Sequence, residues 1–156
     1  MRLSPLLAFV AALSGCGTID MASMPIEGSD HSLTLVREKP YAWSAGWDLA
    51  MVVTRMPDCQ RRHHLKRMGD GNFKIEVFRT EQARWVLRQG KRWYIADTES
   101  CQLQQFEEKP EEPGTPVGVF EDRGGQLRFT QAPGLVKRAE PAAESAPSAE
   151  PAESAK

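Results

Sequence analysis

The stretch whose side chains are most suited to binding ions is "CQRRHHLKR" at residues 59–67, which gathers basic and histidine side chains. Imidazoles are ligands for zinc or copper, and clustered positive charge binds anions. Adjacent histidines on a strand point to opposite faces, so two consecutive histidines cannot easily share one metal ion. We therefore expect neither a metal site nor a cofactor here, and we retain an anion or partner patch as a hypothesis. Its members are Arg61, Arg62, His63, His64, Lys66 and Arg67.

Charge is unevenly distributed along the chain. Residues 55–92 contain eleven Lys and Arg against four Asp and Glu, whereas residues 97–156 contain six against twelve. This segregation favours a basic surface that attracts lipid head groups, acidic glycans or an acidic partner protein. The alternative is that alternating Arg and Lys face solvent, protect sheet edges from further pairing and contact the acidic strands beside them.

The sequence contains no common catalytic motif, such as Gly-x-Ser-x-Gly, His-Glu-x-x-His or a phosphate-binding glycine loop. Two carboxylate pairs, Glu107-Glu108 and Glu111-Glu112, lie in a Pro-rich segment where charge is typically solvated. We therefore expect a non-enzymatic protein.

Short β segments position these groups. "NFKIEVF" at residues 72–78 alternates apolar with polar residues, as a strand with one buried face requires. The "GDG" before it predicts a hairpin with residues 60–68. Glycines predict two further hairpins, of residues 83–89 with 91–97 and of residues 116–122 with 126–131.

Residues 47–56 fit either a strand or a helix, and we favour the strand because Val52, Val53 and Thr54 are β-branched and Pro57 follows. Residues 101–108 are a further predicted strand. We thus expect a mainly β domain of about seven to eight antiparallel strands, either a small sandwich or a partly open barrel.

The tryptophans either line a ligand groove or pack in the core, and core packing is the favoured interpretation. Trp85 and Trp93 are predicted to form a cross-strand pair. Their neighbours Arg84 and Arg92 are available for cation-π stacking.

Residues 1–15 have a positive start, an apolar run of about ten residues and then small residues, which is typical of a secretory signal peptide. The run is too short for a membrane-spanning helix, which needs about 20 residues. Leu13-Ser14-Gly15-Cys16 closely resembles the lipobox of bacterial prolipoproteins. The resemblance implies that Cys16 receives a diacylglycerol, becomes the first residue after cleavage and is then acylated, with palmitate as a typical chain. Because Gly17 rather than Asp follows, it implies an outer-membrane lipoprotein facing the periplasm.

Export to an oxidising compartment leaves Cys59 and Cys101 as an even pair, and we expect a disulfide between them. Two free thiols or a metal site are the alternatives. Residues 16–31 are small and polar, which predicts a disordered, lipidated tether before a β domain at residues 32–137. Residues 138–156 contain almost only Ala, Glu, Pro and Ser and are predicted to be disordered.

Taken together, these features predict a membrane-anchored periplasmic lipoprotein that acts as a binding or accessory module of the bacterial cell envelope. The alternative is an inhibitor or sensor of a hydrolase acting on the envelope, and the third hypothesis is a hydrolase itself. The expected partners are the membrane, through lipid on Cys16, and an envelope protein, anionic glycan or anionic lipid. Nucleic acid is not an expected partner of an exported lipoprotein.

Overall fold

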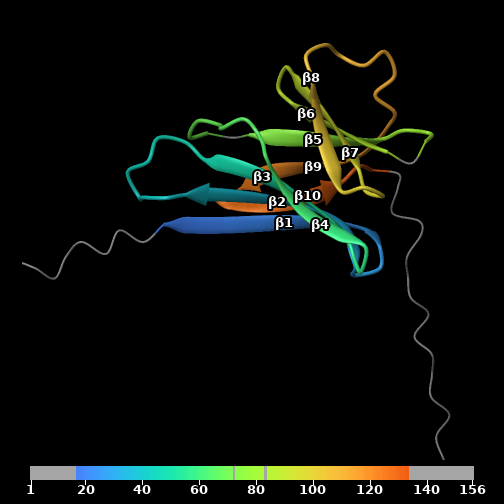
Figure 1. The fold of residues 1–156 in the computed structure, drawn as a ribbon. Coiled ribbons are helices and arrows are strands. Elements are labelled where there is room, and N and C mark those ends of the chain that lie inside the picture. The colour runs from blue at the N-terminus through green and yellow to red at the C-terminus, as the bar shows by residue number, and fades with distance from the viewer. Residues whose placement is uncertain (1–16, 72, 83, 134–156) are drawn as a thin grey trace, which may run out of the picture.

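The protein folds as an antiparallel β-sandwich (Figure 1). The computed structural model describes residues 17–71, 73–82 and 84–133, and these ranges form ten strands and no helix. One sheet has the order β1-β2-β3-β4 and the other has the order β10-β9-β5-β6-β7-β8. The strands of the first sheet are β1 (Thr18–Glu27), β2 (His31–Lys39), β3 (Asp48–Arg55) and β4 (Cys59–His64). Those of the second are β5 (Lys74–Arg79), β6 (Trp85–Gln89), β7 (Arg92–Asp97), β8 (Gln102–Phe106), β9 (Thr115–Arg123) and β10 (Gln126–Gln131).

The core lies between the two sheets and is built from every second residue of their strands, whose side chains point inward. Leu33 and Leu35 on β2 and Met51 and Val53 on β3 are fully buried in one sheet, because every second side chain of a strand points to the same face. Ile75, Val77, Leu87, Ala96 and Phe120 provide the opposing layer. The mainly β, antiparallel fold is therefore confirmed, and its two sheets form a sandwich and not a closed barrel.

Several of the predicted elements are confirmed. Residues 47–56 contain the strand β3 rather than a helix. β6 pairs with β7 and β9 pairs with β10, as the glycine turns between them predict. The described ranges hold two to three more strands than the sequence indicated. They contain no helix that is long and apolar enough to cross a membrane.

The hairpin predicted between residues 60–68 and 72–78 is wrong. β4 pairs with β3, while β5 pairs with β6 and β9 in the other sheet. The "GDG" segment therefore belongs to a crossover between sheets and not to a tight turn within one. An isolated bridge between Trp47 and Met68 holds this crossover against the first sheet.

The prediction that residues 16–31 are a tether is wrong over β1. This strand pairs along its length with β2, with a shift in register between Pro25 and Glu27. Its inward side chains include Met24, which is 2% exposed. Proline is tolerated because β1 is an edge strand, so a missing N–H disrupts no central ladder. The domain thus begins near Thr18 rather than at residue 32.

The two ends of the sandwich are distinguished by the strands that begin and end there. Gly17, Lys39 and Asp48 lie where β1 begins, β2 ends and β3 begins, and we call this the proximal end. The opposite end, where β1 ends, β2 begins and β3 ends, is called the distal end. Figure 1 shows the proximal end on the left and the turn between β1 and β2 on the right. The predicted signal peptide, Cys16 and the predicted tail at residues 138–156 lie outside the described residues.

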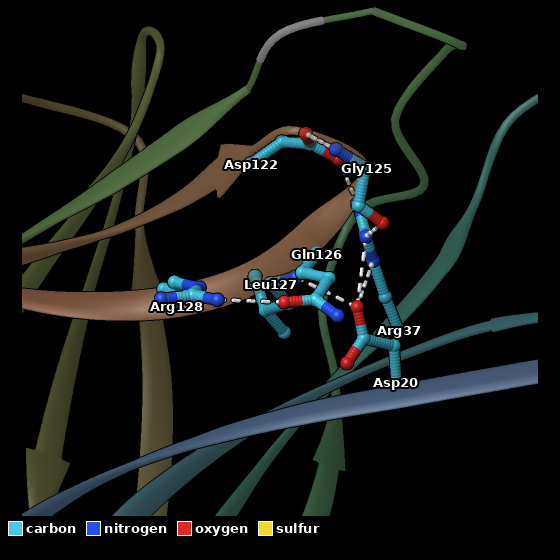
Figure 2. A network of polar contacts seen from close by, with 7 residues as sticks. All are labelled: Asp20, Arg37, Asp122, Gly125, Gln126, Leu127 and Arg128. Carbon is cyan, nitrogen blue, oxygen red and sulfur yellow. Dashed lines mark hydrogen bonds and ion pairs between the residues drawn. The ribbon is translucent and has the colours of Figure 1, made fainter.

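A buried arginine links the two sheets near the proximal end (Figure 2). Arg37 on β2 is 1% exposed, and its guanidinium pairs with Asp20 on β1 at 2.8 Å and with Asp122 on β9. It also donates to the carbonyl oxygen of Gly125 at 2.7 Å. The ring centroid of Trp47 lies 4.4 Å from the guanidinium carbon. Each of the three guanidinium nitrogens of this buried cation therefore has a hydrogen-bond acceptor, as burial of a charge requires.

We call Arg37 together with Asp20 and Asp122 the clamp. Its two carboxylates are held by backbone groups as well. Asp20 accepts from the N–H of Leu127 on β10 at 2.7 Å, which ties the edge strands of the two sheets together. Asp122 accepts from Arg37 and from the N–H of Gly125, and these hydrogen bonds hold the pKa of Asp122 below its ordinary value despite the opposing effect of burial. Since both carboxylates are fixed, the guanidinium is oriented without freedom to rearrange.

The predicted disulfide is confirmed and lies away from this clamp. Cys59, at the start of β4, is bonded to Cys101 in the turn before β8, with Cα atoms 6.1 Å apart. The Nε2 atom of His63 lies 2.8 Å from the carbonyl oxygen of Cys101. Because β4 and β8 belong to different sheets, the disulfide joins the sheets at the side opposite to β1 and β10.

Candidate functional site

A pocket at the distal end is the candidate functional site. It has a volume of about 330 Å³ and lies among the ends of six strands from both sheets. Ile26 and Glu27 on β1 form one wall, and the buried ring of Trp85 on β6 forms another. The remaining lining residues are His31, Arg55, Arg79, Gln82, Arg84, Asp97, Thr98 and Glu99.

The lining balances cations against carboxylates. The guanidinium groups belong to Arg55, Arg79 and Arg84. The carboxylates belong to Glu27, Asp97 and Glu99. In the described part of the chain neither Arg79 nor Arg84 forms an ion pair, whereas Arg55 has only a long contact of 3.8 Å to Asp58. The guanidinium carbon of Arg79 lies 5.6 Å from the ring centroid of Trp85. The aromatic face thus supports a guanidinium whose N–H donors are available to an anion.

The carboxylate of Asp97 is committed to its own turn. It accepts from the backbone N–H of Glu99 and from the hydroxyl of Ser100, each at 2.9 Å. Burial acts to raise the pKa of Asp97, but these hydrogen bonds and the charge of Arg84 outweigh it and hold the pKa below its ordinary value. Asp97 therefore stays ionised and keeps its negative charge in the pocket, while its hydrogen bonds hold the carboxylate in its own turn.

His31 is the titratable group of the pocket nearest to neutral pH. Burial lowers its pKa, the charge of Arg55 lowers it further, and Glu27 opposes both effects. Its Nε2 atom is buried and has no hydrogen-bond partner among the described residues. The imidazole is therefore held neutral, with one polar atom left unpaired between charged neighbours.

The basic stretch that the sequence singled out is not brought into one surface. β4 is an edge strand whose consecutive residues face opposite ways, so Arg62 and His64 are separated from Arg61 and His63. Arg62 pairs with Glu38 at 2.7 Å and Arg67 pairs with Asp48 at 3.2 Å.

These contacts agree with the alternative in which the arginines protect an edge and pair with acidic neighbours. Lys66 follows the strand and is exposed. Across the described ranges, no three His, Cys, Asp or Glu side chains gather closely enough to hold a metal ion.

The tryptophan pair predicted between adjacent arms is wrong. Trp85 lies opposite Ala96, and Trp93 lies opposite Arg88 and packs near Phe78 with ring centroids 6.1 Å apart. The cation-π partners are also different from those predicted, because the arginines directly across the sheet stack on the rings. Arg79 covers Trp85 and Arg88 covers Trp93, whereas Arg84 and Arg92 are only neighbours in sequence.

The distal pocket itself could not be found from the sequence, because its arginines come from three separate strand ends. The one available signal was the Arg-Trp spacing near residues 84–85, which did point to Trp85. The fold and the site together define a disulfide-bonded antiparallel β-sandwich with an arginine-lined pocket at one end. Comparisons with protein families, with curated proteins and with solved structures each found no match.

Proposed function

We propose that this chain is a bacterial lipoprotein, anchored through lipid on Cys16 in the outer membrane, whose sandwich binds an anionic group of an envelope component in the periplasm. The binding role is non-enzymatic, and the distal pocket is its site. The anion belongs to an acidic protein, glycan or lipid, since carboxylates and phosphates are the groups that guanidinium donors recognise best.

The observation that carries this proposal is the pair of arginines without ion-pair partners in the described part of the pocket. Arg79 and Arg84 line a cavity whose nearby carboxylate Asp97 is already used by its own turn. The N–H donors of both guanidinium groups are therefore available to a ligand. Elsewhere in the described ranges, Arg37, Arg62 and Arg67 are paired with Asp or Glu, whereas Arg61, Arg92 and Arg128 form no ion pair and do not line this pocket.

The position of the pocket supports the anchoring part of the proposal. Gly17 directly follows Cys16 and lies at the proximal end, while the pocket lies at the distal end. A lipid on Cys16 would hold the proximal end at the bilayer, because two or three acyl chains give stable attachment. The pocket would then face the aqueous space where envelope components are reached.

One expression experiment with two readouts tests both parts. Radiolabelled palmitate is expected to enter the wild-type protein and to be absent from Cys16→Ser, which also loses membrane fractionation. In cross-linked detergent extracts, the double variant Arg79→Ser/Arg84→Ser is expected to lose partners that the matched variant Arg62→Ser keeps.

Retention of label in Cys16→Ser contradicts the anchor, and equal partner recovery from both arginine variants contradicts the pocket. A single recovered hydrolase, inhibited when it is bound, would favour the role of an inhibitor over that of an accessory module.

A further inference from the structure

The proximal end carries an exposed aromatic pair that the pocket does not explain. The loop between β2 and β3 presents Tyr41 and Trp43, which are 51% and 72% exposed. Their rings are stacked with centroids 5.2 Å apart and planes only 8° from parallel. Ser44 closes the turn, since its N–H donates to the carbonyl oxygen of Tyr41 at 3.0 Å and its Oγ accepts from the N–H of Tyr41 at 3.3 Å. We call Tyr41 and Trp43 the aromatic tip.

The aromatic tip lies beside the point where the chain enters the domain. A Cβ built on Gly17 would lie 2.9 Å from the carbonyl oxygens of both Lys39 and Pro40, so Gly17 packs directly against the start of the loop. Figure 1 shows the loop between β2 and β3 projecting at the same end as the start of β1. Gly17, which follows Cys16 in the sequence, is therefore in direct contact with this loop.

The start of β1 carries two further exposed apolar side chains. Ile19 and Met21 are 65% and 60% exposed, and both are on the outward face of the strand because they are two residues apart. Together with the aromatic tip they account for four of the six large hydrophobic side chains that are exposed in the described ranges. Such a concentration at one end of a small domain indicates an interaction surface.

The base of the loop is fixed and its charge is neutralised. Lys39 pairs with Asp70, and the other oxygen of Asp70 accepts from the N–H of Gly46 at 3.2 Å. The ammonium of Lys39 also lies 5.1 Å from the ring centroid of Trp47. The tip therefore projects from a rigid base and does not carry an unpaired charge at its root.

We propose that Tyr41 and Trp43 insert into the interfacial region of the bilayer that holds Cys16, and so set the orientation of the domain. The inference rests on the proposed lipid attachment for its biological setting. Tyr and Trp have an apolar ring and a polar N–H or O–H, which is the combination that the head-group region accommodates. Attachment at Cys16 holds the tip at a high effective concentration near the bilayer, so weak insertion is enough to fix the orientation.

The test attaches one acyl chain chemically and so does not depend on lipidation in the cell. The chain from Cys16 to Lys156 is purified with its disulfide intact, and a maleimide carrying a single saturated chain is coupled to the thiol of Cys16. One chain gives only reversible membrane binding, so additional contacts change the measured partitioning. The vesicles contain phosphatidylethanolamine and phosphatidylglycerol, with and without bromine on the acyl chains.

Trp43 is 72% exposed, whereas Trp85 and Trp93 are each 5% exposed and Trp47 is partly buried against Arg37 and Lys39. The difference in quenching between the wild type and Trp43→Ser therefore reports on Trp43. Brominated lipid is expected to quench the emission of the coupled wild-type protein, and this quenching is expected to disappear in Trp43→Ser. Partitioning of Trp43→Ser is expected to fall about tenfold, the factor for losing roughly half of the burial energy of a large apolar side chain. The matched variant Phe106→Ser removes an exposed aromatic residue of β8 and is expected to bind as the wild type does.

Equal quenching of wild type and Trp43→Ser, or equal partitioning of Trp43→Ser and Phe106→Ser, would overturn the proposal. So would concentration-dependent burial of Trp43 without vesicles, because the tip would then contact a second copy of the chain. These outcomes are separate from failure of palmitate labelling in cells, which would remove the anchor while leaving the measured membrane contact intact.

Discussion

The clamp around Arg37 offers the sharpest test of what holds the sandwich together, and the variant of choice is Asp20→Ala. The carboxylate of Asp20 accepts from Nε of Arg37 at 3.2 Å, from Nη2 at 2.8 Å and from the N–H of Leu127 at 2.7 Å. Removing it leaves a guanidinium that is 1% exposed with Asp122 as its one remaining carboxylate partner. It also leaves the N–H of Leu127 without its acceptor.

The expected loss of unfolding free energy is about 3 kcal/mol, the lower part of the range for removing one partner of a buried ion pair. We take the lower part because Asp122 still pairs with Arg37 and because the side chain of Asp20 is 27% exposed. For a domain of this size, the melting temperature falls by roughly 4 °C per kcal/mol, or about 12 °C in all.

Urea denaturation of the purified chain measures the effect, with an unchanged denaturant slope as the sign that the two-state transition is preserved. A double-mutant cycle with Arg37→Met separates the ion pair from the rest of the site. Once the buried cation is replaced by methionine, Asp20→Ala is expected to cost about 2 kcal/mol less than it does alone.

Glu38→Ala is the matched control, because Glu38 on β2 also pairs with an arginine of another strand in the same sheet, Arg62 on β4. Its contact to Arg62 is 2.7 Å long, but the two side chains are 31% and 43% exposed. The expected cost is below about 1 kcal/mol, as for other exposed ion pairs. A cost of Asp20→Ala no larger than that of Glu38→Ala, or a cycle without coupling, would refute the argument from burial.

Two further predictions concern the disulfide and the distal pocket. Replacing Cys59 and Cys101 together by Ser is expected to lower stability in urea by about 4 kcal/mol, because the bond closes a loop with a sequence separation of 42 residues; a loss below about 1 kcal/mol would mean that the rest of the fold already restrains this loop. For His31, NMR titration of the imidazole is expected to give a pKa below 6.5, and Arg55→Ser should raise it. Since the folded-state pKa is depressed, the contribution of His31 to stability is present above pH about 6.5 and is lost as the pH falls through the folded value. His31→Asn should flatten the stability profile below pH about 6.5, and an unchanged profile would contradict the assigned burial.

The elements that could be predicted are those whose signals are local. The hairpins around Gly90 and Gly124-Gly125 needed only a turn residue between two alternating segments. The hairpin at "GDG" failed because the same turn signal serves equally well in a crossover between sheets. β1 was missed because apolar residues occupy both of its faces: Met24 is buried, whereas Ile19 and Met21 are exposed. The segment therefore lacks the alternation of apolar and polar residues that predicts a strand.

The site residues are brought together by contacts between positions far apart in the sequence, and no local sequence pattern predicts such contacts. The hydrogen bond from Leu127 to Asp20 joins positions 107 residues apart, and Arg37 meets Asp122 across 85 residues. The distal pocket likewise takes Arg55 and Arg79 from strands in different sheets. The cysteines were found because their chemistry admits few partners, whereas each arginine had many carboxylates available to it.

The clamp also has a mechanical consequence for the lipid attachment that we propose at Cys16. Any pull on Cys16 enters the domain at Thr18, on an edge strand that is hydrogen-bonded on one side to β2. Two residues further on, Asp20 connects that strand both to Arg37 and to the backbone of β10. Force is thus divided between two sheets before it reaches the rest of β1. An edge strand that pairs on one side alone is a weak place to attach an anchor, and the buried ion pair lies where it reinforces that attachment.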